Sequence, residues 1–454
     1  MILGPARRSR ADDPAVMSQS ASLCRFFGLE RTAATEPAIA DPAAEVLAAL
    51  DGLGLNPSQL SGKRIAVAAG SRGIASLAEI VRAACQWLSG QGASPFVFPA
   101  MGSHGGATDE GQRQVLAQYG VTPDFIGAEI RSSMETVQAL RTPEGFPVLM
   151  DRNAWNSDGV LVINRIKPHT RFSGRIESGL LKMIAIGMGK HRGALECHRL
   201  ASRHGSQLVI RSIAGAVLGS GKILAGLALV ENSRHQAAVI RAVKAEAMVQ
   251  AEEELLVLAK RLLPRIPFSK LQLLIVDEIG KDVSGAGMDT NVIGRNLESE
   301  SAEAPAIDLI YARDLTAETA GNALGVGLAD LIHERLRRKV DFDKMYVNAV
   351  TSLNPWVARL PMTFSSDREA LDFALRVLGS PDPTEQRVVS IRNTLSLDRI
   401  LVSEALAAEA GLLVGWRVSP AGRALEFDSH GDLPFATSDS VAAKVDAGKA
   451  RSPQ

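Results

Sequence analysis

Four residues in the first half of the chain have side chains suited to acid–base or metal chemistry. His104 lies in a glycine-rich segment, and His169 follows a continuous apolar run. Lys182 comes next, and His198 lies sixteen residues after it. Histidine exchanges protons near neutral pH, and neutral imidazole binds transition metals. The set therefore points to a site for proton transfer, metal binding or both.

The order and spacing of these residues resemble those of the lactate racemase family, whose members use a nickel pincer nucleotide. The resemblance implies that Lys182 holds the cofactor as a thioamide and that His198 ligates nickel. It also implies that His104 and His169 exchange the proton of the substrate hydroxyl group. The implied activity is that of an isomerase, a racemase or epimerase of a 2-hydroxy acid, working by reversible hydride transfer to the cofactor. Square-planar nickel with three donors from a pincer takes imidazole as a fourth ligand.

Weaker matches suggest further contacts with anionic groups. Arg72 follows the first predicted strand, where the resemblance implies a contact with substrate carboxylate or cofactor phosphate. Lys190, after Gly-Met-Gly, is a candidate for the cofactor phosphate, although a tight turn explains this motif better. In the glycine-rich segment 280–295, Arg295 resembles the cationic residue that the family brings over the substrate, and Lys281 is the second candidate.

The chain also departs from the lactate racemase pattern, and the departures bear on the substrate. Gly105 and Gly106 stand where lactate racemase has Arg-Pro, and Ala69 replaces an aspartate. Ser-Gly-Leu-Leu-Lys, ending at Lys182, replaces Ser-Gly-Gly-Arg-Lys. Because the glycine pair removes side-chain bulk beside His104, we expect an anionic 2-hydroxy acid other than, or larger than, lactate.

Two other functions remain open from the residues alone. In a zinc-dependent hydrolase, His104, His169 and His198 would converge on one ion, because a catalytic zinc site needs three protein ligands. Against it, the chain has no H-E-x-x-H motif or comparable compact ligand pair. Alternatively, a binding or carrier protein would keep a nucleotide pocket without turnover.

Composition favours a cytoplasmic enzyme with a small, diffusible ligand. The 454 residues are 46% hydrophobic, and fifty basic residues balance fifty acidic ones. We therefore expect no nucleic-acid or membrane partner. Cys24, Cys85 and Cys197 lie far apart, which argues against disulfides and thiol-rich metal sites and suits a reducing cytoplasm. The resemblance implies cofactor-synthesis enzymes as partners.

Alternating apolar runs and helical patterns predict an α/β fold. Runs at 64–70, 96–98 and 159–164 read as strands of a Rossmann-like sheet, with helices at 77–88 and after Thr108. His104 and His169 would then follow the carboxyl ends of strands, where open α/β sheets bind ligands. The helical pattern at 235–263 ends before two prolines, and we place the main domain boundary there.

A second, smaller α/β domain is predicted after this boundary. Its strands are expected at 271–276, 308–312, 345–350 and 388–391. The complete prediction has four parts: a loose N-terminal leader (1–40), a cofactor-binding and catalytic domain (41–266), a C-terminal domain that closes over the substrate (267–432) and a polar tail (433–454). The active site would lie in the cleft between the domains.

Overall fold

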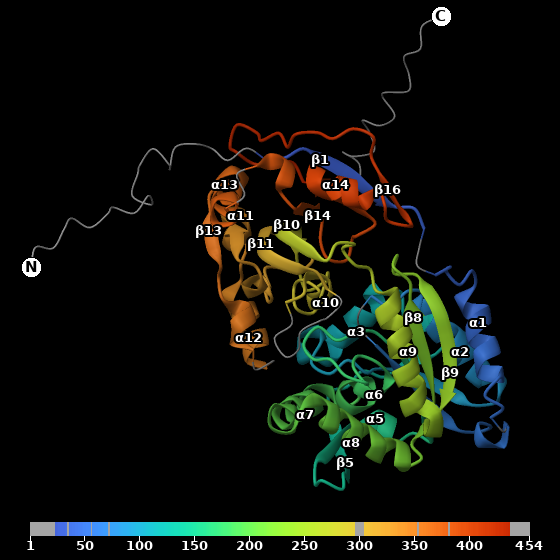
Figure 1. The fold of residues 1–454 in the computed structure, drawn as a ribbon. Helices are drawn as coiled ribbons and strands as arrows, with labels where there is room; N and C mark the ends of the chain where they lie inside the picture. Colours follow the sequence, from blue (N-terminus) through green and yellow to red (C-terminus); the bar gives the residue numbers. More distant parts are fainter. Residues whose placement is uncertain are drawn as a thin grey trace, which may run out of the picture.

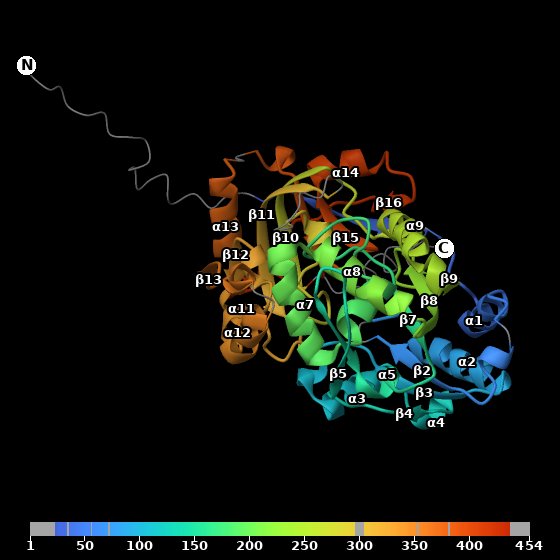
Figure 2. The ribbon, with the colours of Figure 1, turned by 90° about the horizontal axis from the view of Figure 1, so that it is seen from below.

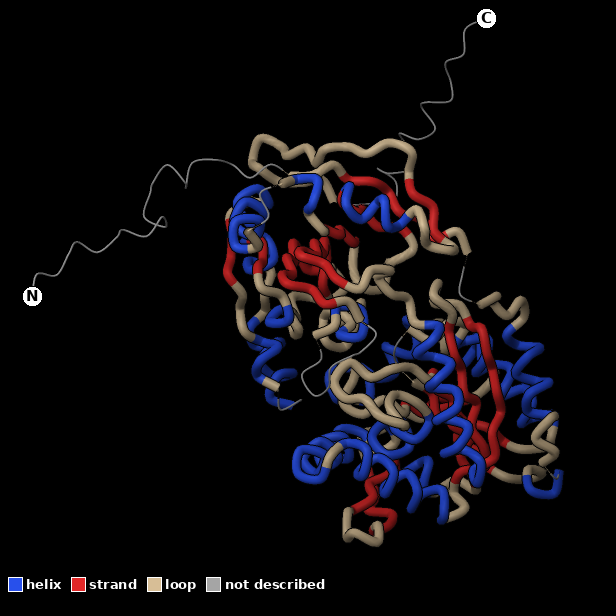
Figure 3. Tube along the Cα trace, viewed as in Figure 1, coloured by secondary structure: helices blue, strands red, loops and turns tan. Residues whose placement is uncertain are grey.

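The computed structural model describes residues 23–435, apart from residues 34–35, 56, 71–72, 296–303, 352–353 and 380–381. The described chain forms two lobes, each built on its own β-sheet with helices packed against it (Figure 1). Figure 3 shows the two groups of strands apart from each other. The predicted α/β fold class is confirmed.

A six-stranded sheet forms the centre of the first lobe, in the order β4-β3-β2-β7-β8-β9. All its strands are parallel except β9, which pairs antiparallel with β8. The predicted strands correspond to β2, β3 and β7, and their apolar runs are continuous because parallel strands are covered on both faces. The strands are β2 (Arg64–Ala69), β3 (Ser94–Pro99), β4 (Glu129–Ile130), β7 (Gly159–Arg165), β8 (Ile223–Glu231) and β9 (Ala237–Lys244).

Helices cover both faces of this sheet, and each face has its own hydrophobic core. Helices α2 and α8 lie on opposite sides of strands β2 and β7 (Figure 2). One face carries α1 (Pro42–Asp51), α2 (Leu77–Gly90) and α4 (Pro123–Ile126). The other carries α5 (Arg152–Trp155), α6 (Leu180–Lys182), α7 (Lys190–His204), α8 (Ser206–Gly219), α9 (Met248–Leu262) and the hairpin of β5 (Thr136–Arg141) and β6 (Pro147–Asp151).

Thr108 begins a helix, as predicted. Its side chain accepts a hydrogen bond from the Gly111 amide at 3.1 Å, and α3 (Asp109–Gln118) follows. An oxygen acceptor at this position satisfies one of the amide groups that the first turn leaves without a partner. The cap fixes where the loop containing His104 ends and the helix starts.

The second lobe contains an eight-stranded sheet in the order β13-β12-β11-β10-β14-β15-β1-β16. Strands β10 to β14 are parallel, and β15, β1 and β16 continue the sheet in antiparallel pairs. The strands are β1 (Phe26–Arg31), β10 (Lys270–Ile279), β11 (Ala306–Leu315), β12 (Leu331–His333), β13 (Met362–Phe364), β14 (Val388–Ile391), β15 (Arg399–Ser403) and β16 (Trp416–Val418).

Two hydrophobic clusters again lie on the two faces of the second sheet. The larger one includes residues of α10 (Thr290–Ile293), α11 (Glu334–Arg338), α12 (Phe342–Thr351) and α14 (Glu404–Ala410). The smaller one includes α13 (Asp367–Val377) and Leu433. The three predicted strands at 271–276, 308–312 and 388–391 are β10, β11 and β14.

The fourth predicted strand of this lobe, residues 345–350, is wrong, because these residues belong to α12. The Asp341 side chain accepts a backbone hydrogen bond in the first turn. Met345 and Ala349, one helical turn apart, are buried, whereas the apolar residues between and after them are exposed. The buried side of the run therefore has helical spacing, which its continuous apolar character concealed.

The predicted helix at 235–263 is correct only in its second part, because residues 237–244 form β9. This segment pairs along its length with β8 and closes one edge of the first sheet. Its alanines and charged residues resemble a helical composition, but the exposed edge of β8 offers hydrogen-bond partners that outweigh so weak a propensity. Helix α9 begins at Met248.

The N-terminal segment also differs from the predicted leader. Residues 26–31 form β1, which pairs with β15 and β16 in the second sheet. Phe26 and Leu29 are buried there, and this apolar pairing explains why the segment is ordered. In the predicted polar tail, Leu433 is buried as well, and residues 436–454 lie outside the described residues.

Among the described residues, we find no helix whose length and apolar character would suit a membrane span.

Candidate functional site

The first sheet changes direction between β2 and β7. The chain runs from β2 outward through β3 to β4, and then returns to the other side of β2 as β7. Parallel sheets bind ligands where the strand order reverses, beyond the carboxyl ends of the two strands. Gly70 follows β2 at this place, and the segment with His169 follows β7.

The second sheet has an equivalent reversal between β10 and β14. The loop after β10 is tied to the segment after β14, since the Asp289 amide donates to Thr394 Oγ1 at 2.9 Å. This loop contacts the first lobe directly. Thr290 Oγ1 donates to the Thr170 carbonyl at 2.6 Å, and Asn291 Nδ2 donates to the His169 carbonyl at 3.4 Å. The loops at the two reversals therefore meet at His169.

Buried Glu177 organises the loop that carries His169. Its carboxylate accepts hydrogen bonds from the amides of His169 at 2.6 Å and Gly174 at 3.1 Å. Lys260 of α9 forms an ion pair with it at 2.5 Å. Paired backbone hydrogen bonds between Lys167 and Ser178 close the base of the loop. The position of His169 is thus set by a charge that the sequence pattern did not single out.

The ring of His169 has a defined orientation in this loop. It stacks on Phe172, with 4.2 Å between ring centroids, and Nδ1 accepts the Arg171 amide at 3.1 Å. A neutral imidazole with Nδ1 as acceptor carries its proton on Nε2. In this geometry His169 therefore offers a donor at Nε2, and action as a base requires the Arg171 hydrogen bond to break.

His104 lies in the loop between β3 and α3. Gln112 holds this loop by donating from Nε2 to the carbonyls of Gly102 at 2.8 Å and His104 at 3.3 Å. Gly105 has φ +63°, and a Cβ atom there would lie 2.5 Å from the backbone of Gly111 in α3. The first glycine after His104 thus has a structural reason, the close approach of the loop to α3.

Lys190, the predicted phosphate contact, lies in the interior of the first lobe. Its side chain is fully buried and its ammonium group donates to the Pro99 carbonyl at 2.6 Å and to Gln112 Oε1 at 3.1 Å. Asp151 completes the set at 3.3 Å. Burial lowers the pKa of Lys190, and the nearby Asp151 charge opposes that effect. Lys190 thus holds the side chain of Gln112, which in turn donates hydrogen bonds to the loop that contains His104.

In the sequence, Lys182 and His198 flank the two residues that the His104 loop contacts, Gly187 and Ala194. Gly102 donates to the Gly187 carbonyl at 3.1 Å, and a Cβ atom on Gly102 would lie 3.5 Å from that of Ala194. Lys182 ends α6 and is followed by a π-helical turn, Met183–Gly187. His198 lies one helical turn after Ala194 in α7. Such π turns occur frequently at functional sites.

The electrostatics of His198 connect three of these segments. Burial lowers its pKa to about 4, and the positive charges of Lys182 and Arg171 lower it further. Lys182 and the loop with His169 are therefore close enough to act on the His198 ring. Its imidazole is neutral at pH 7, which is the form that binds a metal. His198 also lines a cavity of about 550 Å³ whose wall includes Leu195 and, from α12, Val350.

The predicted cationic contacts with the substrate have different surroundings. Arg295 is engaged within the second lobe, where it pairs with Asp330 at 2.5 Å and donates to the Leu328 carbonyl at 2.7 Å. Its role over the substrate stays a prediction. Lys281 lies at the reversal of the second sheet, where its amide donates to Thr319. Arg72 lies outside the described residues.

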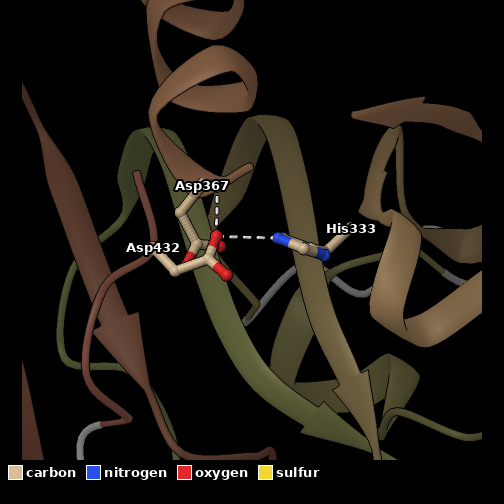
Figure 4. Close-up of side chains that lie close together, drawn as sticks. All are labelled: His333, Asp367 and Asp432. Carbon is tan, nitrogen blue, oxygen red and sulfur yellow. Dashed lines mark hydrogen bonds and ion pairs between the residues drawn. The ribbon is translucent and has the colours of Figure 1, made fainter. Parts of the chain in front are cut away.

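A separate group of potential metal ligands in the second lobe consists of His333, Asp367 and Asp432 (Figure 4). Here His333 Nδ1 accepts the Arg335 amide at 2.9 Å, so the neutral ring carries its proton on Nε2. That atom contacts Asp432 Oδ1 at 2.9 Å. Both oxygens of Asp367 accept hydrogen bonds from Arg313. These bonds use the lone pairs that a metal would need. The two aspartates instead form ion pairs with Arg313 and Arg335.

The geometry also bears on the histidine-cluster zinc site. Among the described residues, His104, His169 and His198 do not bring three ligand atoms within 4.8 Å of one another. A tetrahedral zinc site requires its donors about that close, because each lies about 2 Å from the ion. The described arrangement therefore does not support the hydrolase alternative.

Several residues that shape the site gave no signal in the sequence. Gln112, Glu177 and Asp151 are polar residues with at most 1% exposure, and they hold the segments that carry the candidate residues. Polar residues of these types are usually exposed. Burial depends on the packing of distant segments, so local sequence pattern could not distinguish them from surface residues.

Comparison with known proteins found structural similarity only. No family model and no curated protein matches the chain. The lactate racemase apoprotein from Thermoanaerobacterium thermosaccharolyticum is 14% identical, with a TM-score of 0.48, covering 79% of this chain and 93% of that one. A protein from Thermotoga maritima is also 14% identical, with a TM-score of 0.47, covering 74% of this chain and 83% of that one.

Proposed function

We propose that this protein is a racemase or epimerase of a 2-hydroxy acid that uses a nickel pincer nucleotide. The observation that carries the proposal is that Lys182 and Arg171, from the loop of His169, both lie close enough to the half-buried His198 ring for their charges to lower its pKa. These residues match the order and spacing that resemble the lactate racemase family, and the loop of His169 follows β7, beside which the strand order of the first sheet reverses.

The residues present fit such a cofactor. His198 offers an imidazole whose pKa of about 4 keeps its lone pair available at neutral pH. Lys182, at the end of α6, would provide the covalent attachment. When bound, the cofactor would supply a reversible hydride acceptor for the substrate carbon. Arg171 adds a positive charge beside His198 and suits the phosphate or the substrate carboxylate.

The two loop histidines would move the hydroxyl proton. Removing it while a hydride leaves the carbon that bears the hydroxyl group produces a planar 2-keto acid and avoids a carbanion next to a carboxylate. Reduction from the other face inverts the centre, so one base is needed for each enantiomer. His104 serves one enantiomer. His169 serves the other after its Nδ1 hydrogen bond to Arg171 has broken and its ring has turned.

The division of work follows the two lobes. Residues 41–266 would hold the cofactor, and residues 267–432 would close over the substrate through the loop that contacts Thr170 and His169. Arg295, Lys281 and Arg72 are the proposed cationic contacts, and Arg295 would leave its ion pair with Asp330 to act there. We propose an anionic 2-hydroxy acid other than, or larger than, lactate as the substrate.

Intact-mass and metal analysis after co-expression with cofactor-synthesis enzymes tests the proposal. We expect nickel together with a mass increment on Lys182. His198→Ala should lose nickel, whereas His104→Ala and His169→Ala should keep nickel and lose racemisation. Equal loss of metal in all three variants, or zinc in place of nickel, would refute the assignment. Nickel and the increment without inversion of any enantiopure hydroxy acid would favour a carrier.

A further inference from the structure

We propose that Glu252 is the positioning residue for Lys182, acting through the backbone of α6. Glu252 belongs to α9 and is 1% exposed, although a carboxylate is among the side chains that are rarely buried. Its Oε2 atom accepts the Leu181 amide at 2.8 Å. Leu181 directly precedes Lys182, so the contact fixes the peptide from which the lysine side chain departs.

The sequence of α6 explains why this contact is needed. Gly179, at its N-terminal end, has no side chain that could cap the helix. The amides of the first turn of a helix have no partners within the helix. Glu252 supplies the missing acceptor from a different element, and the backbone of both Leu180 and Leu181 contributes to its hydrogen bonding.

A second set of contacts holds Gly179 from the other side. Asn164, near the carboxyl end of β7, donates from Nδ2 to the Gly179 carbonyl at 2.7 Å. A Cβ atom on Gly179 would lie 2.5 Å from both Cδ and Oε1 of Glu252. Glycine is therefore required for the carboxylate to approach. The start of α6 is fixed between the sheet and α9.

The cost of this arrangement indicates a role beyond packing. Among the buried side-chain atoms of the described residues, Oε1 of Glu252 has no hydrogen-bond partner. A buried carboxylate oxygen without a partner destabilises the folded state. An apolar residue at position 252 would avoid this cost but would leave the Leu181 amide without its acceptor. The carboxylate is therefore kept in the interior as the hydrogen-bond acceptor for the segment that ends at Lys182.

The experiment measures the chemistry of Lys182 in the apoprotein. The protein is treated with the succinimidyl ester of acetic acid, and acetylation of Lys182 is followed by peptide mass spectrometry relative to exposed Lys63. Glu252→Ala should change the ratio of the two rates by about fivefold, the effect of about one hydrogen bond. Glu252→Gln should restore most of the wild-type ratio, because its amide oxygen can still accept the Leu181 amide.

Matched variants separate positioning from general destabilisation. Glu254→Gln, on the exposed side of the same helix, should leave the ratio unchanged. Gly179→Ala should shift the ratio as Glu252→Ala does, since the new methyl group displaces the carboxylate. Folded Glu252→Ala and Gly179→Ala proteins with the wild-type ratio would overturn the proposal.

Wild-type protein alone keeps the proposal testable if these variants do not fold. Hydrogen exchange of peptides that cover residues 176–187 should show strong protection at Leu181. Exchange as fast as in an open loop would refute the contact. The inference rests on the proposed function only in treating Lys182 as the reacting side chain. Absence of nickel and of the mass increment would refute that function without changing the labelling result.

Discussion

Both lobes bury charged side chains, but they use them differently. In the second lobe, Asp367 accepts hydrogen bonds from Tyr311, Arg313, Arg335 and the Leu433 amide. This network fastens the C-terminal segment to the sheet. In the first lobe, buried charges hold the backbone of segments that carry candidate site residues.

The two lobes also differ in how many hydrogen-bond and charge partners their buried carboxylates have. Hydrogen bonds and the charge of Arg313 hold the pKa of Asp367 at about 2, against the raising effect of burial. Burial raises the pKa of Glu252 to about 7, and the Leu181 and Leu180 amides and Arg211 only partly offset it. In the paired network, loss of one partner leaves an uncompensated buried charge, whereas the incompletely paired carboxylate of Glu252 is itself a cost to the folded state.

The largest expected effect on stability follows from disrupting the hydrogen-bond network around Asp367 in the second lobe. Asp367→Asn leaves Arg313 buried beside fewer negative charges, and we expect a loss of about 4 kcal/mol in the free energy of unfolding. Chemical denaturation followed by circular dichroism measures it. Asp343→Asn, at an exposed position of the same lobe, is the control and should change stability by less than about 0.5 kcal/mol.

A smaller loss should follow from Lys190→Met in the first lobe. This change leaves Asp151 buried without its cation and removes a support of Gln112, and we expect a loss of about 3 kcal/mol. The double variant with Asp151→Asn should recover part of it. Arg192→Met, on the exposed side of α7, serves as the control. Wild-type stability in Lys190→Met would instead favour the prediction that Lys190 faces a ligand.

The next-largest effect is the contribution of Glu252 to the pH dependence of stability. Its pKa is about 7 in the folded protein and about 4.5 when exposed, so folding takes up a proton between these values. The stabilising contribution is complete below about pH 4.5 and is lost as the pH rises through about 7. Relative to Glu252→Gln, wild type should lose on the order of 2 kcal/mol between about pH 5 and pH 7. Parallel curves for the two proteins would contradict the buried position of this carboxylate.

The smallest effect concerns the proximity of Lys182 and His198. Because the lysine charge helps to lower the pKa of His198, Lys182→Met should raise that pKa. Titration of the histidine ring signals by NMR measures the change. Lys222→Met, which removes a lysine at another position of the first lobe, should leave the pKa of His198 unchanged. An unchanged pKa of His198 in Lys182→Met would mean that the two side chains lie too far apart to interact, which would contradict the proposed site.

Local pattern was sufficient for most of the fold and for a list of candidates. Strands β2, β3, β7, β10, β11 and β14 follow from apolar runs, because a parallel strand covered on both faces must be apolar throughout. The start of α3 follows from Thr108, whose side chain is a suitable cap. The histidines and Lys182 were found by residue type and spacing.

The tertiary structure decided what the candidates contact, since contacts depend on segments distant in sequence. Lys190 and Arg295 read as exposed cations, yet packing placed carboxylates and carbonyls around both. Residues 345–350 became a helix because only two of them meet a core. Glu252 lies 71 residues from the amide that it accepts, and no local pattern encodes such a pairing. The sequence by itself determined which chemical groups are available, and the tertiary structure determined which of them are buried, paired and aimed at one another.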